Sequence, residues 1–251
     1  LDDSPTVEHL LGERDWSHPA VPGHLTVPIG VVDRPYDQRR DPLVIDLAGA
    51  AGNVAVVGGP QSGKSTTLRT FIMSMAATHT PEQVQFYCLD FGGGSFAGMQ
   101  AHPHIAGVAM RTETEAVRRT VAQVEAVLDA REQYFRAHGI DSIDTYRTRR
   151  AQGLVDDGYG DVFLIVDGMA TLRAEYDTLE PRVQTLAARG WTKDGGDLFE
   201  VLTGPEAWRE VARLNRLPDA VKSRGVFVNK GGQDYLVTYP NGYTCHFERP
   251  D

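Results

Sequence analysis

The sequence is 251 residues long, is 41% hydrophobic and 24% charged, and carries a formal net charge of −9. This length allows one large domain, or one medium domain and a small one, with a normal hydrophobic core. An acidic chain with two distant cysteines and no apolar stretch of about 18 residues is a poor candidate for a nucleic-acid binder, a disulfide-stabilised domain or a membrane-spanning protein.

The N-terminal region predicts a short helix and two strands. We expect the helix over residues 6–11 and the strands over 25–33 and 43–47, with a charged turn between the strands. Pro28 cannot donate a ladder hydrogen bond, so the first strand is expected at a sheet edge. The two strands predict a small β-layer flanking the main domain. This layer would either contact a bound base or only cover a sheet edge.

The next feature is a glycine-rich turn between an apolar run and a helical segment. Gly58, four further residues and Gly63-Lys64-Ser65 match the P-loop pattern. We expect a strand over 54–57 and a helix over 67–77, which is the context that this pattern requires. An ordinary glycine turn is the alternative, and the four fixed positions of the pattern argue against it.

The P-loop pattern predicts a triphosphate site. Glycines let successive backbone N–H groups point toward an anion, and the following helix adds the positive end of its dipole. Lys64 would contact the β- and γ-phosphates, and the Ser65 hydroxyl would bind Mg²⁺. The residues predicted to contact the nucleotide here are Gly58, Gly59, Pro60, Gln61, Ser62, Gly63, Lys64, Ser65 and Thr66.

Another strand is expected over residues 84–90, and a glycine-rich loop follows it. Ligands in open α/β sheets bind beyond the carboxyl ends of the strands. Asp90, the last residue of this strand, is therefore predicted to bind the nucleotide on its γ-phosphate side or to lie at a subunit contact, with a flexible connection as the alternative. Residues 105–110 predict a short strand. His102 and His104 precede it without further ligands at metal-binding spacing.

Two helices are expected next. Thr112, with Glu115 three residues later, predicts a capping box at the start of a long helix, and Gly139 predicts its end. A shorter helix is expected over 141–150. Its basic side chains predict a solvated face or, alternatively, a subunit interface; they belong to Arg147, Arg149 and Arg150.

Residues 161–167 form an apolar run that ends in aspartate, as a buried central strand does. After a P-loop this is the Walker B pattern, and Asp167 is predicted to hold Mg²⁺ together with Ser65. Many P-loop ATPases place a glutamate at the next position to activate water, but Gly168 has no side chain. We therefore assign no catalytic residue and expect slow hydrolysis, because loss of a general base costs about 10²–10⁴ in rate.

Several segments together carry a family resemblance that is narrower than the P-loop alone. The segments are 28–35, 41–47, 56–66, 89–94, 131–142 and 163–168. They resemble FtsK/SpoIIIE-type ATPase modules, and more narrowly a later nucleotide domain of the EccC ATPases of mycobacterial type VII secretion. The resemblance covers about residues 1–190.

The resemblance implies a RecA-like fold within the α/β class and binding of ATP and Mg²⁺. It also implies a hexameric or stacked assembly with other ATPase domains of a membrane-anchored parent, on the cytoplasmic side of the inner membrane. Later domains of this family often lack the glutamate after the Walker B aspartate, as at Gly168, and help engage small helical WXG-type substrates. The chain starts without methionine, so we expect it to be a piece of a longer protein.

The resemblance ends where the family would continue into a core strand with a polar sensor residue. We therefore expect a P-loop ATPase domain over 1–190 and a small α+β unit over 191–251. A short helix is predicted over 206–214. Strands over 235–239 and 243–247, with Asn241-Gly242 between them, predict a β-hairpin.

These features predict an ATP-binding, weakly hydrolysing module of a type VII secretion ATPase. One alternative is an active P-loop translocase motor, which would need a base and an arginine finger from elsewhere. The other places the function in the C-terminal unit, as a protein-binding or toxin-like module. No nucleic-acid partner is expected, because the chain is acidic and has no recognisable basic recognition module.

Overall fold

The computed structural model describes residues 5–12, 25–48, 53–59, 61–189, 227–231, 234–238 and 244–247. The chain divides into two compact units. The first comprises residues 1–56 and 63–200, and the second comprises residues 57–62 and 201–251. All of the described α-helices belong to the first unit, and none of them is long and apolar enough to cross a bilayer.

The flanking β-layer of the first unit is a two-stranded antiparallel hairpin, as predicted. Its strands are β1 (Thr26–Arg34) and β2 (Arg39–Asp46), joined by a 3₁₀ turn at Pro35–Asp37. The register shifts between Pro28 and Gly30, where proline supplies no N–H to the ladder. The charged turn is shorter than expected because its basic residues pair across the strands, as in the 2.9 Å contact of Arg34 with Asp41.

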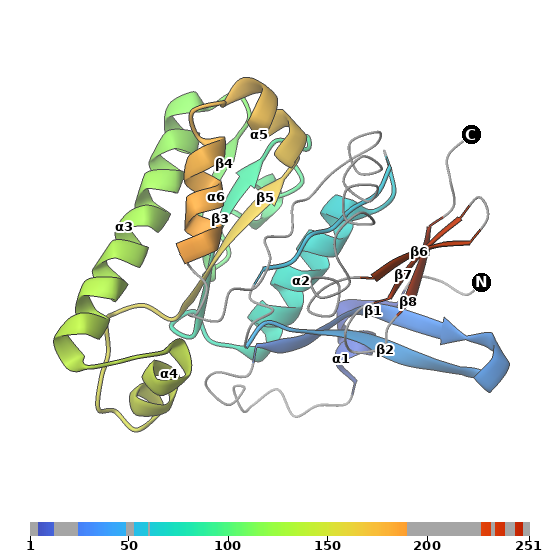
Figure 1. The fold of residues 1–251 in the computed structure, drawn as a ribbon, viewed down its shortest axis with the longest axis horizontal. Coiled ribbons are helices and arrows are strands. Elements are labelled where there is room, and N and C mark those ends of the chain that lie inside the picture. The colour runs from blue at the N-terminus through green and yellow to red at the C-terminus, as the bar shows by residue number, and fades with distance from the viewer. Residues whose placement is uncertain are drawn as a thin grey trace. The chain divides into compact units, whose positions relative to one another are not determined.

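The centre of the first unit is a parallel sheet with the strand order β4-β3-β5. Its strands are β3 (Val84–Asp90), β4 (Ile105–Met110) and β5 (Asp161–Asp167), and all three have the predicted bounds. Figure 1 shows the sheet between helix α2 (Lys64–Thr78) on one side and helices α3 (Thr114–His138) and α6 (Glu180–Arg189) on the other.

The hydrophobic core joins the β-layer, α2 and the sheet. Val27 of β1, Ile72 and Met75 of α2, and Phe86 of β3 are all fully buried. Phe71 meets the rings of Phe86 and Phe163 edge-on, with centroids 5.8 and 5.5 Å apart. The core therefore fixes α2, which begins at Lys64, against the strands that end in Asp90 and Asp167.

One predicted strand is absent. Described residues 53–59 form no strand, although the run 54–57 is apolar. Val54 and Val57 are 43% and 36% exposed. The prediction was wrong because β propensity alone does not supply a ladder partner, and no described strand pairs with this run.

Helix α3 (Thr114–His138) lacks the predicted capping box. Its N-cap residue is Glu113, which makes no side-chain cap; instead the Glu113 carboxylate accepts a 2.9 Å hydrogen bond from the Met110 N–H. The helix ends as predicted at Gly139, with φ of 58°. The remaining helices are α1 (Val7–Leu11), α4 (Ile143–Ala151), α5 (Met169–Glu175) and α6 (Glu180–Arg189).

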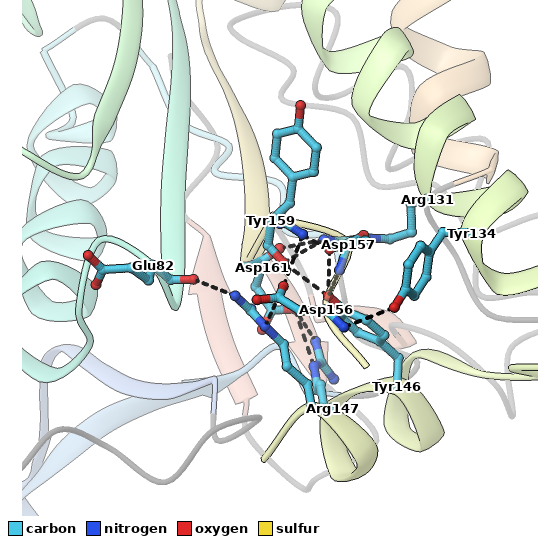
Figure 2. Close-up of polar contacts among 12 residues, drawn as sticks. Glu82, Arg131, Tyr134, Tyr146, Arg147, Asp156, Asp157, Tyr159 and Asp161 are labelled. Atoms are coloured by element: carbon cyan, nitrogen blue, oxygen red, sulfur yellow. Dashed lines mark hydrogen bonds and ion pairs between the residues drawn. The ribbon is translucent and has the colours of Figure 1, made fainter. Parts of the chain in front are cut away.

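A buried polar cluster joins α3 and α4 to the segment that leads into β5 (Figure 2). The Arg131 guanidinium lies 2.6 Å from the Asp157 carboxylate, and their side chains are only 13% and 4% exposed. Arg131 also donates to the carbonyl oxygens of Tyr159 and Gly160, and the Tyr146 hydroxyl donates to Asp157. This cluster fixes the start of β5.

One of the basic residues of α4, Arg147, does not lie on a solvated face. The Arg147 side chain is 12% exposed and lies 2.6 Å from the Asp161 carboxylate, at the first residue of β5. It also donates a 3.0 Å hydrogen bond to the Ala48 carbonyl, just after β2. The prediction missed these contacts because helical periodicity shows only which residues share a face of the helix. It does not show that a distant segment supplies an acidic partner.

The described strands of the second unit form an antiparallel sheet with the order β6-β7-β8. They are β6 (Phe227–Gly231), β7 (Asp234–Thr238) and β8 (Thr244–Phe247). The predicted hairpin strands are confirmed, with Thr238 opposite Thr244. The predicted helix over 206–214 and the turn at Asn241-Gly242 lie outside the described residues. The predicted domain boundary after residue 190 stays a prediction.

Replacing Asp157 by Ala should lower the free energy of unfolding by about 3 kcal/mol, because it leaves a buried guanidinium without its counter-charge. Arg118→Ala is the control, since Arg118 pairs with Glu115 at the surface, where the side chains are 56% and 87% exposed. Such exposed pairs contribute about 0–1 kcal/mol. Urea unfolding measures both variants, and equal losses would contradict the structural role of the buried pair.

The contribution of Asp157 should also depend on pH. Burial alone raises the pKa of its carboxyl, but hydrogen bonds from Arg131 and Tyr146 outweigh burial and hold the pKa below its ordinary value of 3.8. The stabilisation is therefore present above that value and is lost as the pH falls through the lowered pKa. The difference in unfolding free energy between the wild type and Asp157→Asn should shrink between about pH 5 and pH 2. A constant difference would contradict this.

Candidate functional site

Two aspartates end neighbouring parallel strands at the carboxyl edge of the sheet. Asp90 is the last residue of β3, Asp167 is the last residue of β5, and the ladder places them directly opposite each other. Their side chains are buried, with exposed fractions of 2% and 4%. Ligands of open α/β sheets bind at this edge, so the register brings together the two acidic residues that the sequence predicted for a nucleotide–metal site.

Asp90 uses both carboxylate oxygens to hold the loop that follows it. Oδ1 accepts hydrogen bonds from the N–H groups of Gly92 and Gly94 at 3.2 and 3.1 Å, and Oδ2 accepts from Phe96 at 2.8 Å. Phe96 is fully buried and anchors the far end of the loop. Asp90 thus organises its own loop, and contact of its side chain with a nucleotide stays a prediction.

Asp167, in contrast to Asp90, lacks a hydrogen-bond donor at one of its carboxylate oxygens. Its Oδ2 atom is buried and has no hydrogen-bond partner. Its main-chain oxygen accepts a 2.9 Å hydrogen bond from the Phe91 N–H, which joins the end of β5 to the loop after β3. An unpartnered buried carboxylate oxygen is costly to a protein unless a cation or donor satisfies it.

The carboxylate of Asp167 fits Mg²⁺. This ion prefers oxygen ligands and is usually held by one or two carboxylates together with substrate phosphates. Among the described residues no group of three or more His, Cys, Asp or Glu side chains could hold a metal unaided. The residue set therefore suits an ion that arrives with phosphate oxygens better than a permanent structural metal.

The residues of the P-loop pattern are divided between the two units. Gly63, Lys64, Ser65 and Thr66 belong to the same unit as Asp167, whereas residues 57–62 belong to the other unit. Gly63 caps α2 with φ of 89°, and Lys64 and Ser65 form the first turn of the helix, both half-buried. The helix begins earlier than predicted. Gln61 has φ of 58°, and Pro60 lies outside the described residues.

The position after Asp167 accommodates glycine and disfavours a side chain. Gly168 has φ of 93°, and a Cβ atom there would lie 3.0 Å from Phe91 Cβ. Phe91 is itself buried and packs on the Tyr176 ring, with centroids 5.4 Å apart. A glutamate at this position would need a strained backbone and displacement of Phe91. No signal in the sequence identified Phe91 as the residue that closes this position.

Two other reactive residue types serve structural roles. Burial raises the pKa of the Cys88 thiol to about 12, so it is a poor nucleophile. His104 Nε2 lies 2.8 Å from the His79 carbonyl oxygen, which ties the start of β4 to the end of α2.

Comparison with known proteins agrees with this geometry. Residues 21–190 match the model of the FtsK/SpoIIIE family. The chain belongs to this family. It is 54% identical over 188 residues to the ESX secretion system protein EccC of Thermomonospora curvata, and 50% identical over 190 residues to the ESX-4 secretion system protein EccC4 of Mycobacterium tuberculosis. These matches cover 74% and 76% of the chain but only 14% and 15% of the relatives.

Solved structures confirm the fold. The cytoplasmic domain of the Thermomonospora curvata type VII secretion ATPase EccC matches 99% of this chain with a TM-score of 0.75 and 43% identity, over 31% of its own length. A structure of ATPases 2 and 3 of the same protein, in complex with a signal sequence peptide, also has a TM-score of 0.75, with 40% identity. It likewise matches 99% of this chain, over 48% of its own length. The α/β P-loop ATPase fold and the resemblance to EccC are thereby confirmed.

Introducing the missing glutamate should not create an efficient ATPase. We expect Gly168→Glu to leave ATP turnover unchanged and to lower the free energy of unfolding by about 1–3 kcal/mol, because of its positive φ and the contact with Phe91. Gly158→Glu is the matched control, since Gly158 has φ of 84° but nothing within 4 Å of the added Cβ. Brisk turnover by Gly168→Glu would contradict this account of the position.

Proposed function

We propose that this chain is an ATP- and Mg²⁺-binding, weakly hydrolysing module of a type VII secretion ATPase. The observation that carries the proposal is the buried, unpartnered Oδ2 atom of Asp167 at the carboxyl end of β5. The same chain contains the P-loop pattern, and its relatives include EccC. Mg²⁺ bound with ATP would supply positive charge at this oxygen.

The chain's own residues support binding more than chemistry. Lys64, in the first turn of α2, would contact the β- and γ-phosphates, the Ser65 hydroxyl and Asp167 would hold the ion, and the N–H groups of residues 63–66 would donate to the phosphates. At Gly168 there is no carboxylate to take a proton from water. Hydrolysis should therefore be about 10²–10⁴ slower than in a domain with a general base.

The proposed partners follow from the relatives. A relative has been solved as ATPases 2 and 3 with a signal sequence peptide, so we propose that this module lies beside other ATPase domains of one protein, arranged as a hexamer. In this role it helps engage secreted helical WXG-type substrates on the cytoplasmic side of the inner membrane. ATP binding would then regulate assembly or substrate engagement, while another domain hydrolyses ATP.

Titration of the whole chain with ATP, with and without Mg²⁺, tests the proposal. We expect binding that Mg²⁺ strengthens and turnover near the detection limit. Lys64→Ala should weaken binding about tenfold or more, because it removes charge-assisted hydrogen bonds to phosphate. Arg69→Ala, which removes an exposed cation from the same helix outside the P-loop pattern, is the control and should bind like the wild type.

Two outcomes would overturn the proposal. Absence of affinity for ATP in the wild type would exclude the nucleotide site. Brisk turnover that Lys64→Ala abolishes would instead establish the translocase motor, with a base supplied from a position other than residue 168.

A further inference from the structure

The loop after β3 lies directly on the Asp167 carboxylate. A Cβ atom added to Gly92 would lie 2.4 Å from Asp167 Oδ2, 2.7 Å from Cγ and 3.1 Å from Oδ1. Cβ atoms in proteins essentially never approach other atoms closer than 3.0 Å. Gly92 is exposed to solvent, whereas Asp167 is 4% exposed. The glycine backbone therefore forms part of the cover over the carboxylate.

This loop is held at both ends. Asp90 accepts hydrogen bonds from the N–H groups of Gly92, Gly94 and Phe96, and the Phe91 N–H donates to the main-chain oxygen of Asp167. Phe91 and Phe96 are buried on either side of the glycines. The loop is thus tied to the ends of β3 and β5, so Gly92 cannot move away from Asp167 without breaking these contacts.

The two neighbouring carboxylates therefore differ in their ability to bind a cation. Donors from the loop satisfy Asp90 at both oxygens, while the same loop contacts Asp167 through Gly92 and gives its Oδ2 no donor. A donor at Asp167 would compete with a cation, and a side chain at position 92 would push the carboxylate away. Gly92 avoids both, because it has no side chain and its N–H donates to Asp90 instead.

We propose that Gly92, held by Asp90, is a positioning residue that sets the Asp167 carboxylate for the cation of a bound nucleotide. The inference rests on the proposed function, because the cation is the one that ATP would bring. It also has a part that needs no nucleotide: Gly92 and Asp167 are coupled through direct contact.

A double-mutant cycle tests this coupling in the nucleotide-free chain. Gly92→Ala should lower the melting temperature by about 3–8 °C through the enforced contact with the carboxylate. In the Asp167→Ala background, which removes that carboxylate, the same change should have little effect. Gly98→Ala is the matched control, because Gly98 is also an exposed glycine, in the 3₁₀ helix Ala97–Met99 that follows the loop, but has nothing within 4 Å of an added Cβ.

The double-mutant cycle can also contradict the proposal. An equal melting-temperature loss in both backgrounds would overturn the proposal, as would no loss in either. If Gly92→Ala alone does not fold, recovery of folding in Gly92→Ala with Asp167→Ala supports the coupling, and failure to recover overturns it.

Nucleotide titration provides the readout that a merely structural role would not change. Mg²⁺ should strengthen ATP binding of the wild type and Gly98→Ala, whereas Gly92→Ala should lose about tenfold or more of this gain and keep the Mg²⁺-free affinity. A full Mg²⁺-dependent gain in Gly92→Ala would overturn the positioning role. Absence of ATP binding in the wild type would instead refute the proposed function, and the melting cycle would still decide whether Gly92 and Asp167 are coupled.

Discussion

The parallel register of β3 with β5 is the constraint on which the rest of the site depends. It places Asp90 opposite Asp167, so that two carboxylates lie side by side in a buried environment. Like charges in such a position are unfavourable unless donors or cations satisfy them. The structure resolves this at Asp90 with three backbone N–H groups and leaves one oxygen of Asp167 without a partner.

The two ends of β5 differ in how their buried charges are satisfied. At the start of β5, Asp161 meets Arg147, and nearby Asp157 meets Arg131 and Tyr146. Figure 2 shows these side chains converging on the segment that enters the strand. At the end of β5, Asp167 meets no cation among the described residues. The start of β5 is therefore held by ion pairs, while the remaining charge at its other end is suited to a ligand.

Much of this arrangement follows from sequence patterns, and some of it does not. The strands β3, β4 and β5 begin and end where apolar runs predicted, because buried parallel strands need continuous apolar residues. The same reasoning was wrong for residues 54–57, which form no described strand, because an apolar run does not specify a ladder partner. The pairing of Arg147 with Asp161 was missed because it joins a helix to a strand that local periodicity cannot connect.

Sequence patterns likewise predict part of the candidate site and leave another part unpredicted. The patterns identified Lys64, Asp90, Asp167 and the bare position Gly168 as the residues to examine. They could not reveal that Asp90 is occupied by its own loop, or that Gly92 touches the Asp167 carboxylate, because both depend on backbone geometry beyond the strand ends. That geometry distinguishes Asp90, which shapes the site, from Asp167, which would bind the ion.

The most direct test of the central claim is electron paramagnetic resonance of Mn²⁺, a substitute for Mg²⁺, titrated into the chain with a slowly hydrolysed ATP analogue. We expect a protein-bound manganese signal that requires both the nucleotide and Asp167, and that is lost in Asp167→Ala. A bound signal of equal strength in Asp167→Ala would contradict the claim that this buried oxygen is kept for the ion of the nucleotide.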